Sequence, residues 1–456
     1  MTSTPATPSD PRLKSATDII RAAQTGTRTP LDIAEAAIER AHAAARYDAI
    51  HELFAEEARA EAKRLGDRDD LAALPLAGLP VLIKDNIPVS GHPLRVGSRA
   101  TSAAAADHDH EVVRRLRDAG AIILGTTRVP ELCVFGTTDS HYGHVTNPWN
   151  PDHAPGGSSG GASAAVAAGI VPVAHAADGM GSIRIPAAAT GTFGIKPGRG
   201  TVPAGMGHDS WGGMSENGVI AHRVADAALT LSVMAADPTL ASVTEPPHPL
   251  RIAVATNTPS FLVSVTRPWR EAVNRTADAL RAAGHEVTVL KYPYPANPIP
   301  LFARWFSGVA SDAHDLDHAR LEPRTRRHVK LGLRAQRRGW VRPADADRED
   351  AKARALFADY DVIMTPTLAR RPPLAHAWHK RSWFANIWSN LRYAPFPSLW
   401  NMLGYPAASV PAGFDEKHLP TAVMLVAAPG NEMTLLSLAV QLERVQPWPL
   451  AADMNN

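Results

Sequence analysis

The sequence predicts an α/β fold, in which a large, mixed and mostly parallel sheet is covered by helices on both faces. After residue 67, short apolar runs alternate with helical segments, a pattern typical of such sheets. Apolar residues make up 45% of the 456 residues, which is ample for a large core. There is no internal repeat and no long flexible linker. We therefore expect one main domain over residues 67–446.

The N-terminal part has a different texture. Residues 1–10 are rich in Thr, Ser and Pro and are expected to be disordered. Residues 11–66 are expected to form a helical arm, because apolar residues recur near the helical period from Ser15 onward. Pro30 should open the second helix of this arm, since the first turn tolerates its fixed φ and its missing N–H.

The main domain is expected to begin with buried strands that alternate with helices. The predicted strands in its first half are 81–84, 121–125 and 170–174, and the helices between them are 112–119 and 163–168. The second half repeats this texture, with strands 250–254, 360–366 and 407–411, helices 269–283 and 435–442, and an arginine-rich helical segment within 301–345.

Composition narrows the class of protein. The net charge of +2 gives no global field that would favour nucleic acid or an anionic membrane. A single cysteine, Cys133, excludes an internal disulfide framework and fits a reducing compartment. The Ala-rich run 162–177 is too short to span a bilayer, and no secretory signal is recognised at the start. A cytoplasmic location is therefore expected.

Lys84 ends the first apolar run of the main domain, Leu79-Pro80-Val81-Leu82-Ile83. A lysine at a strand end usually extends its ammonium group to water. Burial would instead disfavour the ammonium form and leave a neutral amine, which can act as a general base. The residue alone does not decide between these interpretations.

A second segment of interest reads Gly156-Gly157-Ser158-Ser159-Gly160-Gly161. It could be a flexible loop, or Ser159 could cap the Ala-rich helix that follows. It also matches the G-x-S-x-G nucleophile elbow, which requires a strand directly before it. Three prolines within residues 147–155 argue against such a strand. The elbow interpretation is therefore disfavoured.

A third segment, Asp178-Gly179-Met180-Gly181-Ser182, follows a predicted strand. Glycines allow successive backbone N–H groups to point into one concavity, which binds an anion. Such donors stabilise the oxyanion of a tetrahedral intermediate. The segment has none of the glycine patterns typical of phosphate-binding loops. A turn with a purely structural role is the alternative.

Together the three segments resemble, in order and spacing, the amidase signature family. The likeness extends from about Pro30 to about Gln446. It includes residues 78–86, 120–125, 146–150, 156–161, 178–184, 194–197, 401–406 and 419–420.

The resemblance implies an amide hydrolase with a Ser–cis-Ser–Lys triad. Ser182 would be the nucleophile, Ser158 the bridging serine on a cis peptide bond, and Lys84 the base. The oxyanion hole would be formed by the backbone N–H groups of Gly179, Met180, Gly181 and Ser182. The supporting residues would be Asp178, Arg184 and Ser159. The substrate would be a small organic amide, with no cofactor, metal, nucleic acid or membrane partner, and a homodimer is expected.

Two positions depart from the family's usual pattern of Thr-Asp followed by a Gly-Gly pair. Ala177 removes one hydroxyl from the support of the loop. Met180 carries a side chain that could narrow the acyl pocket or require a strained φ. Both changes concern rate and substrate range more than reaction class. The segments expected to shape the substrate pocket are 205–217 and 301–345.

Other functions remain as alternatives. The chain could be the catalytic subunit of a tRNA-dependent amidotransferase, which needs partner subunits. It could also bind an amide without hydrolysing it, or be an esterase-type hydrolase, which would need a catalytic histidine.

Three further features are interpreted as structural. Residues 107–111 have the spacing of metal ligands, but acidic residues there also suit the start of a helix. The basic run 324–338 is expected to be a solvated helix face. Cys133 is expected to be a small core residue.

Overall fold

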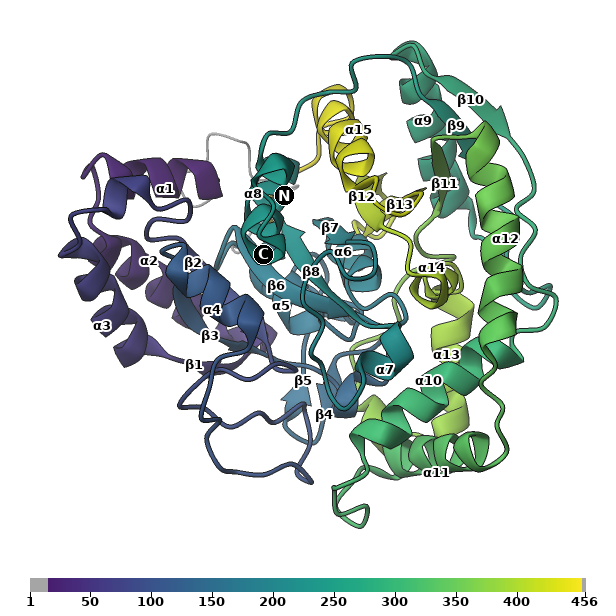
Figure 1. The fold of residues 1–456 in the computed structure, drawn as a ribbon, viewed down its shortest axis with the longest axis horizontal. Helices are drawn as coiled ribbons and strands as arrows, with labels where there is room; N and C mark the ends of the chain where they lie inside the picture. The colour runs from purple at the N-terminus through teal and green to yellow at the C-terminus, as the bar shows by residue number, and fades with distance from the viewer. Residues whose placement is uncertain (1–14, 453–456) are drawn as a thin grey trace.

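The computed structural model describes residues 15–452, and the N-terminal residues 1–10 that we expected to be disordered lie outside this range. Within it, one sheet of 11 strands runs in the order β1-β3-β2-β6-β8-β7-β12-β13-β11-β9-β10 (Figure 1). The strands of this sheet are β1 (Ile50–Leu53), β2 (Pro80–Lys84), β3 (Ile122–Thr127), β6 (Val173–Asp178), β7 (Phe193–Lys196), β8 (Glu216–Ala221), β9 (Arg251–Val254), β10 (Glu286–Val289), β11 (Val362–Pro366), β12 (Ala407–Phe414) and β13 (Pro420–Ala427). A small ribbon pairs β4 (Asp139–Ser140) with β5 (Gly143–His144).

The predicted fold class, a large mixed sheet covered by helices, is confirmed. Parallel pairing links β3, β2 and β6 toward one end of the sheet and β11, β9 and β10 at the other. The centre, from β6 through β8, β7, β12 and β13 to β11, is antiparallel. The parallel share is therefore smaller than the alternation of strands and helices suggests.

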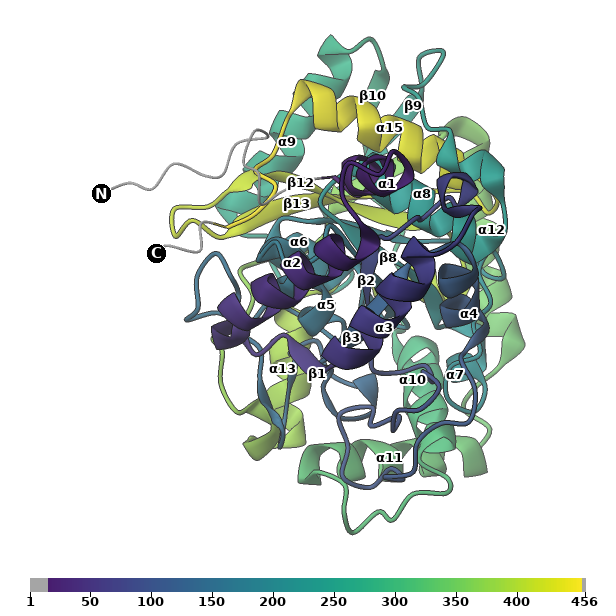
Figure 2. The ribbon, with the colours of Figure 1, turned by 90° about the vertical axis from the view of Figure 1, so that its left-hand side faces the viewer.

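The helices in the described range are α1 (Ala16–Gln24), α2 (Pro30–Ala43), α3 (Ala55–Gly66), α4 (Glu111–Asp118), α5 (Gly160–Ala167), α6 (Arg184–Thr190), α7 (Ser210–Gly213), α8 (Val224–Ala235), α9 (Arg267–Ala282), α10 (Ile299–Asp312), α11 (Pro323–Arg337), α12 (Pro343–Asp359), α13 (Trp383–Tyr393), α14 (Ser398–Leu403) and α15 (Glu432–Val445). Figure 2 shows α9 and α15 on one side of β12 and β13, and α6 on the other. Helices thus cover both faces of the sheet.

The N-terminal arm is mainly helical, as its periodicity predicts, and its described residues form α1, α2 and α3. α2 begins at Pro30, and a capping box of Thr29 and Asp32 closes its first turn. The arm also contains β1, which the helical pattern did not predict. β1 pairs antiparallel with β3 at the edge of the main sheet, so the arm and the sheet are joined by backbone hydrogen bonds.

One predicted strand is displaced along the chain. Residues 170–174 were expected to form it, but β6 begins at Val173. The N–H groups of Gly169 and Ile170 instead donate to carbonyls of α5, which closes that helix, and Pro172 then separates the helix from the strand. The shift places Asp178 at the end of β6.

α5 is a buried helix of small residues, with every position shielded from solvent. An added Cβ at Gly161 would lie 2.5 Å from the Ala49 carbonyl oxygen and 2.6 Å from the Arg128 nitrogen. Glycine is therefore required where α5 approaches the chain around β1 and β3. This close packing fixes the loop that precedes α5, which carries Ser158.

Helices α10 to α14 lie together at one side of the molecule, at the right of Figure 1. The predicted helical character of residues 301–345 is confirmed by α10, α11 and the start of α12. These helices face the ends of β6 and α6, and the space between them holds the site described next.

Candidate active site

Lys84 is the last residue of β2, a strand buried along its whole length. Its Nζ donates to the Ser158 Oγ at 2.9 Å and to the Ala177 carbonyl oxygen at 2.9 Å. Burial lowers the pKa of the Lys84 ammonium below its ordinary value, although Cys133 and Asp178 oppose the shift. The interpretation of Lys84 as a solvent-exposed strand end is therefore wrong.

Ser158 follows a cis peptide bond from Gly157 and is buried. No strand of the sheet lies within residues 146–159, so the nucleophile-elbow interpretation of this segment is wrong. Ser159 occupies the N-cap position of α5 but does not cap it with its side chain. Its Oγ instead donates to the Ala177 carbonyl oxygen at 3.1 Å, and its N–H donates to the Ser182 carbonyl oxygen at 3.2 Å. Ser159 thus joins the two serine segments.

Ser182 lies in the turn between β6 and α6. In this turn the N–H of Gly181 already donates to the Asp178 Oδ1 at 2.6 Å. The N–H groups of Gly179, Met180 and Ser182 make no hydrogen bond to another residue in the range 15–452. Of the four N–H groups predicted to form an oxyanion hole, that of Gly181 is therefore already engaged by Asp178.

A buried ion pair supports this turn. The Arg184 Nε lies 2.9 Å from the Asp178 Oδ2, and both side chains are fully shielded from solvent. Burial opposes ionisation of Asp178, but Arg184 and hydrogen bonds hold the pKa of this carboxyl well below its usual range. The Asn401 Nδ2 adds a bond of 2.9 Å to the Asp178 Oδ1 and one of 2.7 Å to its carbonyl oxygen. Asn401 lies in a segment that carries the family likeness, but its contact with Asp178 was not predicted.

The structure brings Lys84 and Ser158 into direct contact and places Ser182 across the same cavity from them. Within the described residues, no hydrogen bond joins the hydroxyls of Ser158 and Ser182. Hydrogen bonds of catalytic groups are often longer in the absence of substrate and shorten when it binds.

Two cavities meet at Ser182. The small cavity has a volume of about 210 Å³ and includes Lys84, Ser158 and Ser182 in its wall. The large cavity has a volume of about 900 Å³ and includes Met180 and Ser182. The segment 205–217 contributes Met206, Gly207, Trp211 and Ser215 to the small cavity, and α10 contributes to both. The sequence did not predict that residues of α13 and α14 would line these cavities.

Met180 does not have a positive φ, unlike its neighbour Gly181, whose φ is 114°. The strained backbone that we considered for Met180 is therefore not found. Its side chain lines the large cavity beside Ser182, where it takes up space that the family's usual glycine leaves open.

Cys133 also lies at the site. It is partly exposed, packs against the apolar cluster that includes Phe135 and Trp305, and lines the small cavity together with Lys84 and Ser158, so it lies at the boundary between the core and the site. Burial raises the pKa of the Cys133 thiol, which favours the neutral form.

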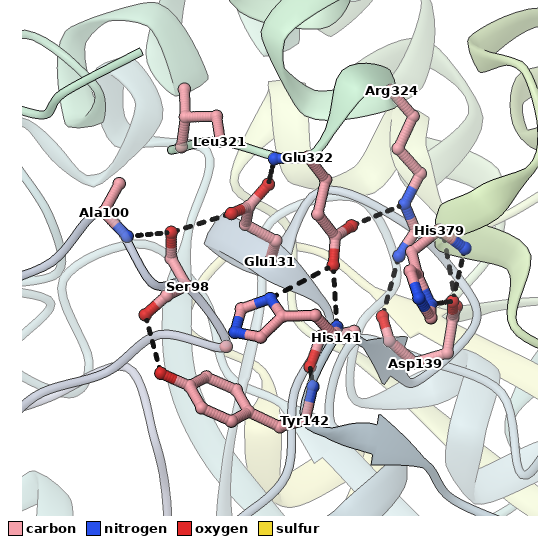
Figure 3. A network of polar contacts seen from close by, with 12 residues as sticks. Ser98, Ala100, Glu131, Asp139, His141, Tyr142, Leu321, Glu322, Arg324 and His379 are labelled. Atoms are coloured by element: carbon pink, nitrogen blue, oxygen red, sulfur yellow. Dashed lines mark hydrogen bonds and ion pairs between the residues drawn. The ribbon is translucent and has the colours of Figure 1, made fainter. Parts of the chain in front are cut away.

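Figure 3 shows a polar network around Glu131, Glu322 and Arg324. The Arg324 guanidinium donates to Glu322 at 3.0 Å and to Asp139 at 3.2 Å, and Glu131 accepts from Ser98 at 2.8 Å. Arg324 is fully buried, so the expectation of a solvated face for the run 324–338 is wrong at its first residue. Its guanidinium also lies 4.4 Å from the centre of the Phe135 ring, a wall of the large cavity.

The segment 107–111 behaves as the start of a helix. α4 begins at Glu111, and the His110 Nδ1 accepts from the Val112 N–H at 3.1 Å. Asp109 accepts from the Ser90 N–H and pairs with Arg117. Among residues 15–452, no group of three or more His, Cys, Asp or Glu side chains is placed to hold a metal ion.

Comparison with known proteins decides the family. The Amidase family profile matches residues 32–436. The chain belongs to the amidase signature family. This amidase is 41% identical to a protein of Mycobacterium tuberculosis that is named as the amidase AmiB2. The aligned 403 residues cover 86% of this chain and 87% of the relative. It is therefore an amide hydrolase.

Solved structures agree with this assignment. The amidase is similar to 6-aminohexanoate cyclic dimer hydrolase, with a TM-score of 0.88 and 28% identity over 98% of this chain and 99% of that chain. It is also similar to a bacterial aryl acylamidase of the same family, with a TM-score of 0.82 and 25% identity over 97% and 98% of the two chains. In the range 15–452, no helix of the amidase is long and apolar enough to cross a membrane.

Proposed function

We propose that this amidase hydrolyses a small organic carboxamide through a seryl acyl-enzyme, with Ser182 as nucleophile, Ser158 as proton relay and Lys84 as base. The observation that carries the proposal is the contact of 2.9 Å between the Lys84 Nζ and the Ser158 Oγ, buried in a cavity that Ser182 also lines. A buried lysine with a lowered pKa can accept a proton near neutral pH.

The proposed reaction proceeds in two halves. The Ser182 Oγ attacks the carbonyl carbon while its proton passes to Ser158, whose own proton passes to Lys84. The N–H groups of the turn stabilise the oxyanion. Ser158 then protonates the leaving nitrogen and takes its own proton back from Lys84 as the C–N bond breaks, and water hydrolyses the acyl-enzyme by the same relay. Lys84 and Ser158 supply the proton transfers, so this mechanism uses no cofactor.

The supporting residues have geometric reasons for their roles. Asp178 and Arg184 fix the turn that carries the N–H donors, and Ser159 ties the Ser158 loop to the carbonyl of Ser182. Both relatives with solved structures are named for amide-bond hydrolysis, which supports the reaction class. A cytoplasmic location and a homodimer stay predictions.

Labelling with a fluorophosphonate tests the nucleophile. We expect intact-protein mass to show one adduct on the wild type and none on Ser182→Ala. Ser163→Ala is the matched control, because Ser163 lies within α5 and its hydroxyl, among residues 15–452, hydrogen-bonds only to the Gly160 carbonyl oxygen. A wild-type protein that takes up no adduct, or a Ser182→Ala protein that still takes one up, would contradict the proposal.

A further inference from the structure

The two cavities that meet at Ser182 differ in which parts of the relay they contain. Lys84 and Ser158 line the small cavity, and neither lines the large one. Within the segment 156–161, which carries Ser158, only Gly157 lines the large cavity. The proton relay therefore opens into one cavity only.

This asymmetry sets the direction of a bound amide, given the proposed function on which the inference rests. The leaving nitrogen must receive its proton from Ser158, so the nitrogen and its substituent lie toward the small cavity. The acyl group extends from the other side of the carbonyl carbon and so enters the large cavity. The two parts of the substrate thus meet different walls.

The volumes limit what each cavity can hold. A protein cavity of about 150 Å³ accommodates one benzene molecule. The small cavity, at about 210 Å³, must also hold the reacting amide atoms, which leaves little room for a leaving group. The large cavity, at about 900 Å³, falls in the range of sites for drug-sized ligands.

The walls of the large cavity suit an apolar group. Eight aromatic residues line it, namely Phe135, Phe261, Tyr292, Tyr294, Phe302, Trp305, Trp388 and Tyr393. Two apolar residues of its lining, Phe261 and Leu262, are 96% and 59% exposed. Exposed apolar residues that continue an apolar cavity are typical of a binding site for apolar ligands. Both cavities also carry polar side chains, namely Asn86 and Asp312 in the small one and Asp345, Arg348, Glu349 and Lys352 in the large one, so the two cavities differ mainly in volume.

We propose that the substrates of this amidase are carboxamides with a large apolar acyl group, aromatic or long-chain, and a small leaving amine, either ammonia or a short alkylamine. Ser182 forms an ester with the acyl group as the C–N bond breaks. The amine leaves with the proton that originates from Ser182. Water then releases the carboxylic acid and restores the serine hydroxyl.

Two isomeric amides test this assignment. 3-(2-Naphthyl)propanamide carries its naphthyl group on the acyl side, and N-(2-naphthylmethyl)acetamide carries the same group on the amine side. We expect kcat/KM to be at least about tenfold higher for the first, because the second must force the ring system into the small cavity. Propanamide and N-methylacetamide, also isomers, give the same comparison without the naphthyl group and correct for the intrinsic difference between the two kinds of amide.

The outcomes separate this inference from the proposed function. Equal rates, or a preference for N-(2-naphthylmethyl)acetamide, would overturn the orientation while leaving the hydrolase mechanism intact. Hydrolysis of neither naphthyl amide by a protein that still forms the Ser182 adduct would overturn the substrate class alone. A wild type without that adduct would mean that the proposed function itself fails.

A variant pair locates the acyl group. Leu391, on α13, lines the large cavity, and Leu391→Trp should lower kcat/KM for 3-(2-naphthyl)propanamide about tenfold relative to propanamide. Val289→Trp adds the same side chain on an exposed position of β10 and should leave this ratio unchanged. An unchanged ratio in Leu391→Trp would contradict the placement of the acyl group.

Discussion

Lys84 is held between a hydroxyl and a carbonyl oxygen, both 2.9 Å from its Nζ, at the end of a fully buried strand. A protonated lysine could donate to both acceptors, but its charge would be almost fully shielded from bulk solvent. The balance favours the neutral amine more than it does in water, and the lone pair of that amine is what the proposed relay requires.

We predict that activity increases as pH is raised until Lys84 loses its proton. Burial lowers the pKa of Lys84 from 10.5, so kcat/KM should reach its plateau at a pH below that of an ordinary lysine. Below this pKa the amine is protonated and cannot accept the proton of Ser158. A pH profile of kcat/KM measures the midpoint. Lys84→Ala should reduce kcat/KM by at least about 10²-fold. A kcat/KM that does not fall at any pH where the protein stays folded, or that Lys84→Ala leaves unchanged, would argue against Lys84 as the base.

At the scale of elements, α10 and the segment 205–217 form one wall of the site. The Trp211 Nε1 donates to the Asp312 Oδ2 at 2.7 Å, and the His208 N–H donates to the Asp312 Oδ1 at 2.9 Å. An added Cβ at Gly308 would lie 2.6 Å from the Trp211 Cα. The helix can therefore approach the segment this closely only because residue 308 is glycine.

We predict that Gly308→Ala separates α10 from Trp211. The overlap with backbone cannot be relieved by a side-chain rotation, so unfolding in urea should show a loss of about 1–3 kcal/mol. KM should rise as well, since both partners line the cavities at Ser182. Ser307→Ala, one residue earlier in α10, is the matched control, because the Ser307 Oγ has no hydrogen-bond partner in the described structure. A Gly308→Ala protein with unchanged stability and KM would contradict this account.

At the scale of the whole molecule, the network of Figure 3 joins segments far apart in the sequence. Glu322 accepts from the His141 N–H at 3.0 Å and from Arg324, and Arg324 donates to Asn386 on α13 at 2.7 Å. The segment around β4 is thereby joined to the helices that wall the large cavity. Burial, reinforced by Glu131 and Asp139, raises the pKa of Glu322 to about 7 despite Arg324.

We predict that this carboxyl makes stability depend on pH. The folded-state pKa of Glu322 is about 7 and its ordinary value is 4.5, so the folded protein holds this proton more tightly. The contribution of Glu322 to the free energy of unfolding is complete below about pH 4.5 and is lost as pH rises toward 7. Across this pH window, the free energy of unfolding measured in urea should decline less steeply for Glu322→Gln than for the wild type. Identical slopes for the two proteins would refute the assignment.

Local sequence patterns predicted the residues of the candidate site better than the residues that line its cavities. Lys84, Ser158 and Ser182 stand in short segments whose composition is itself informative, and β2 and β6 place two of these segments side by side. Asn401 and Trp388 reach the site only through the packing of α14 and α13, which no periodicity in the chain indicates. β1 was missed because four residues between two helices carry too weak a pattern, and β6 was displaced because the end of α5 is as apolar as a strand.

The meeting of the two cavities at Ser182 also bears on the order in which the amine leaves and water enters the active site. While an acyl group of the proposed acyl-enzyme fills the large cavity, the other cavity described above that Ser182 lines is the small one, which the amine has just left. The water that completes the reaction must arrive by that route. Departure of the amine therefore precedes entry of water, and any small amine in solution competes with water for the same acyl-enzyme.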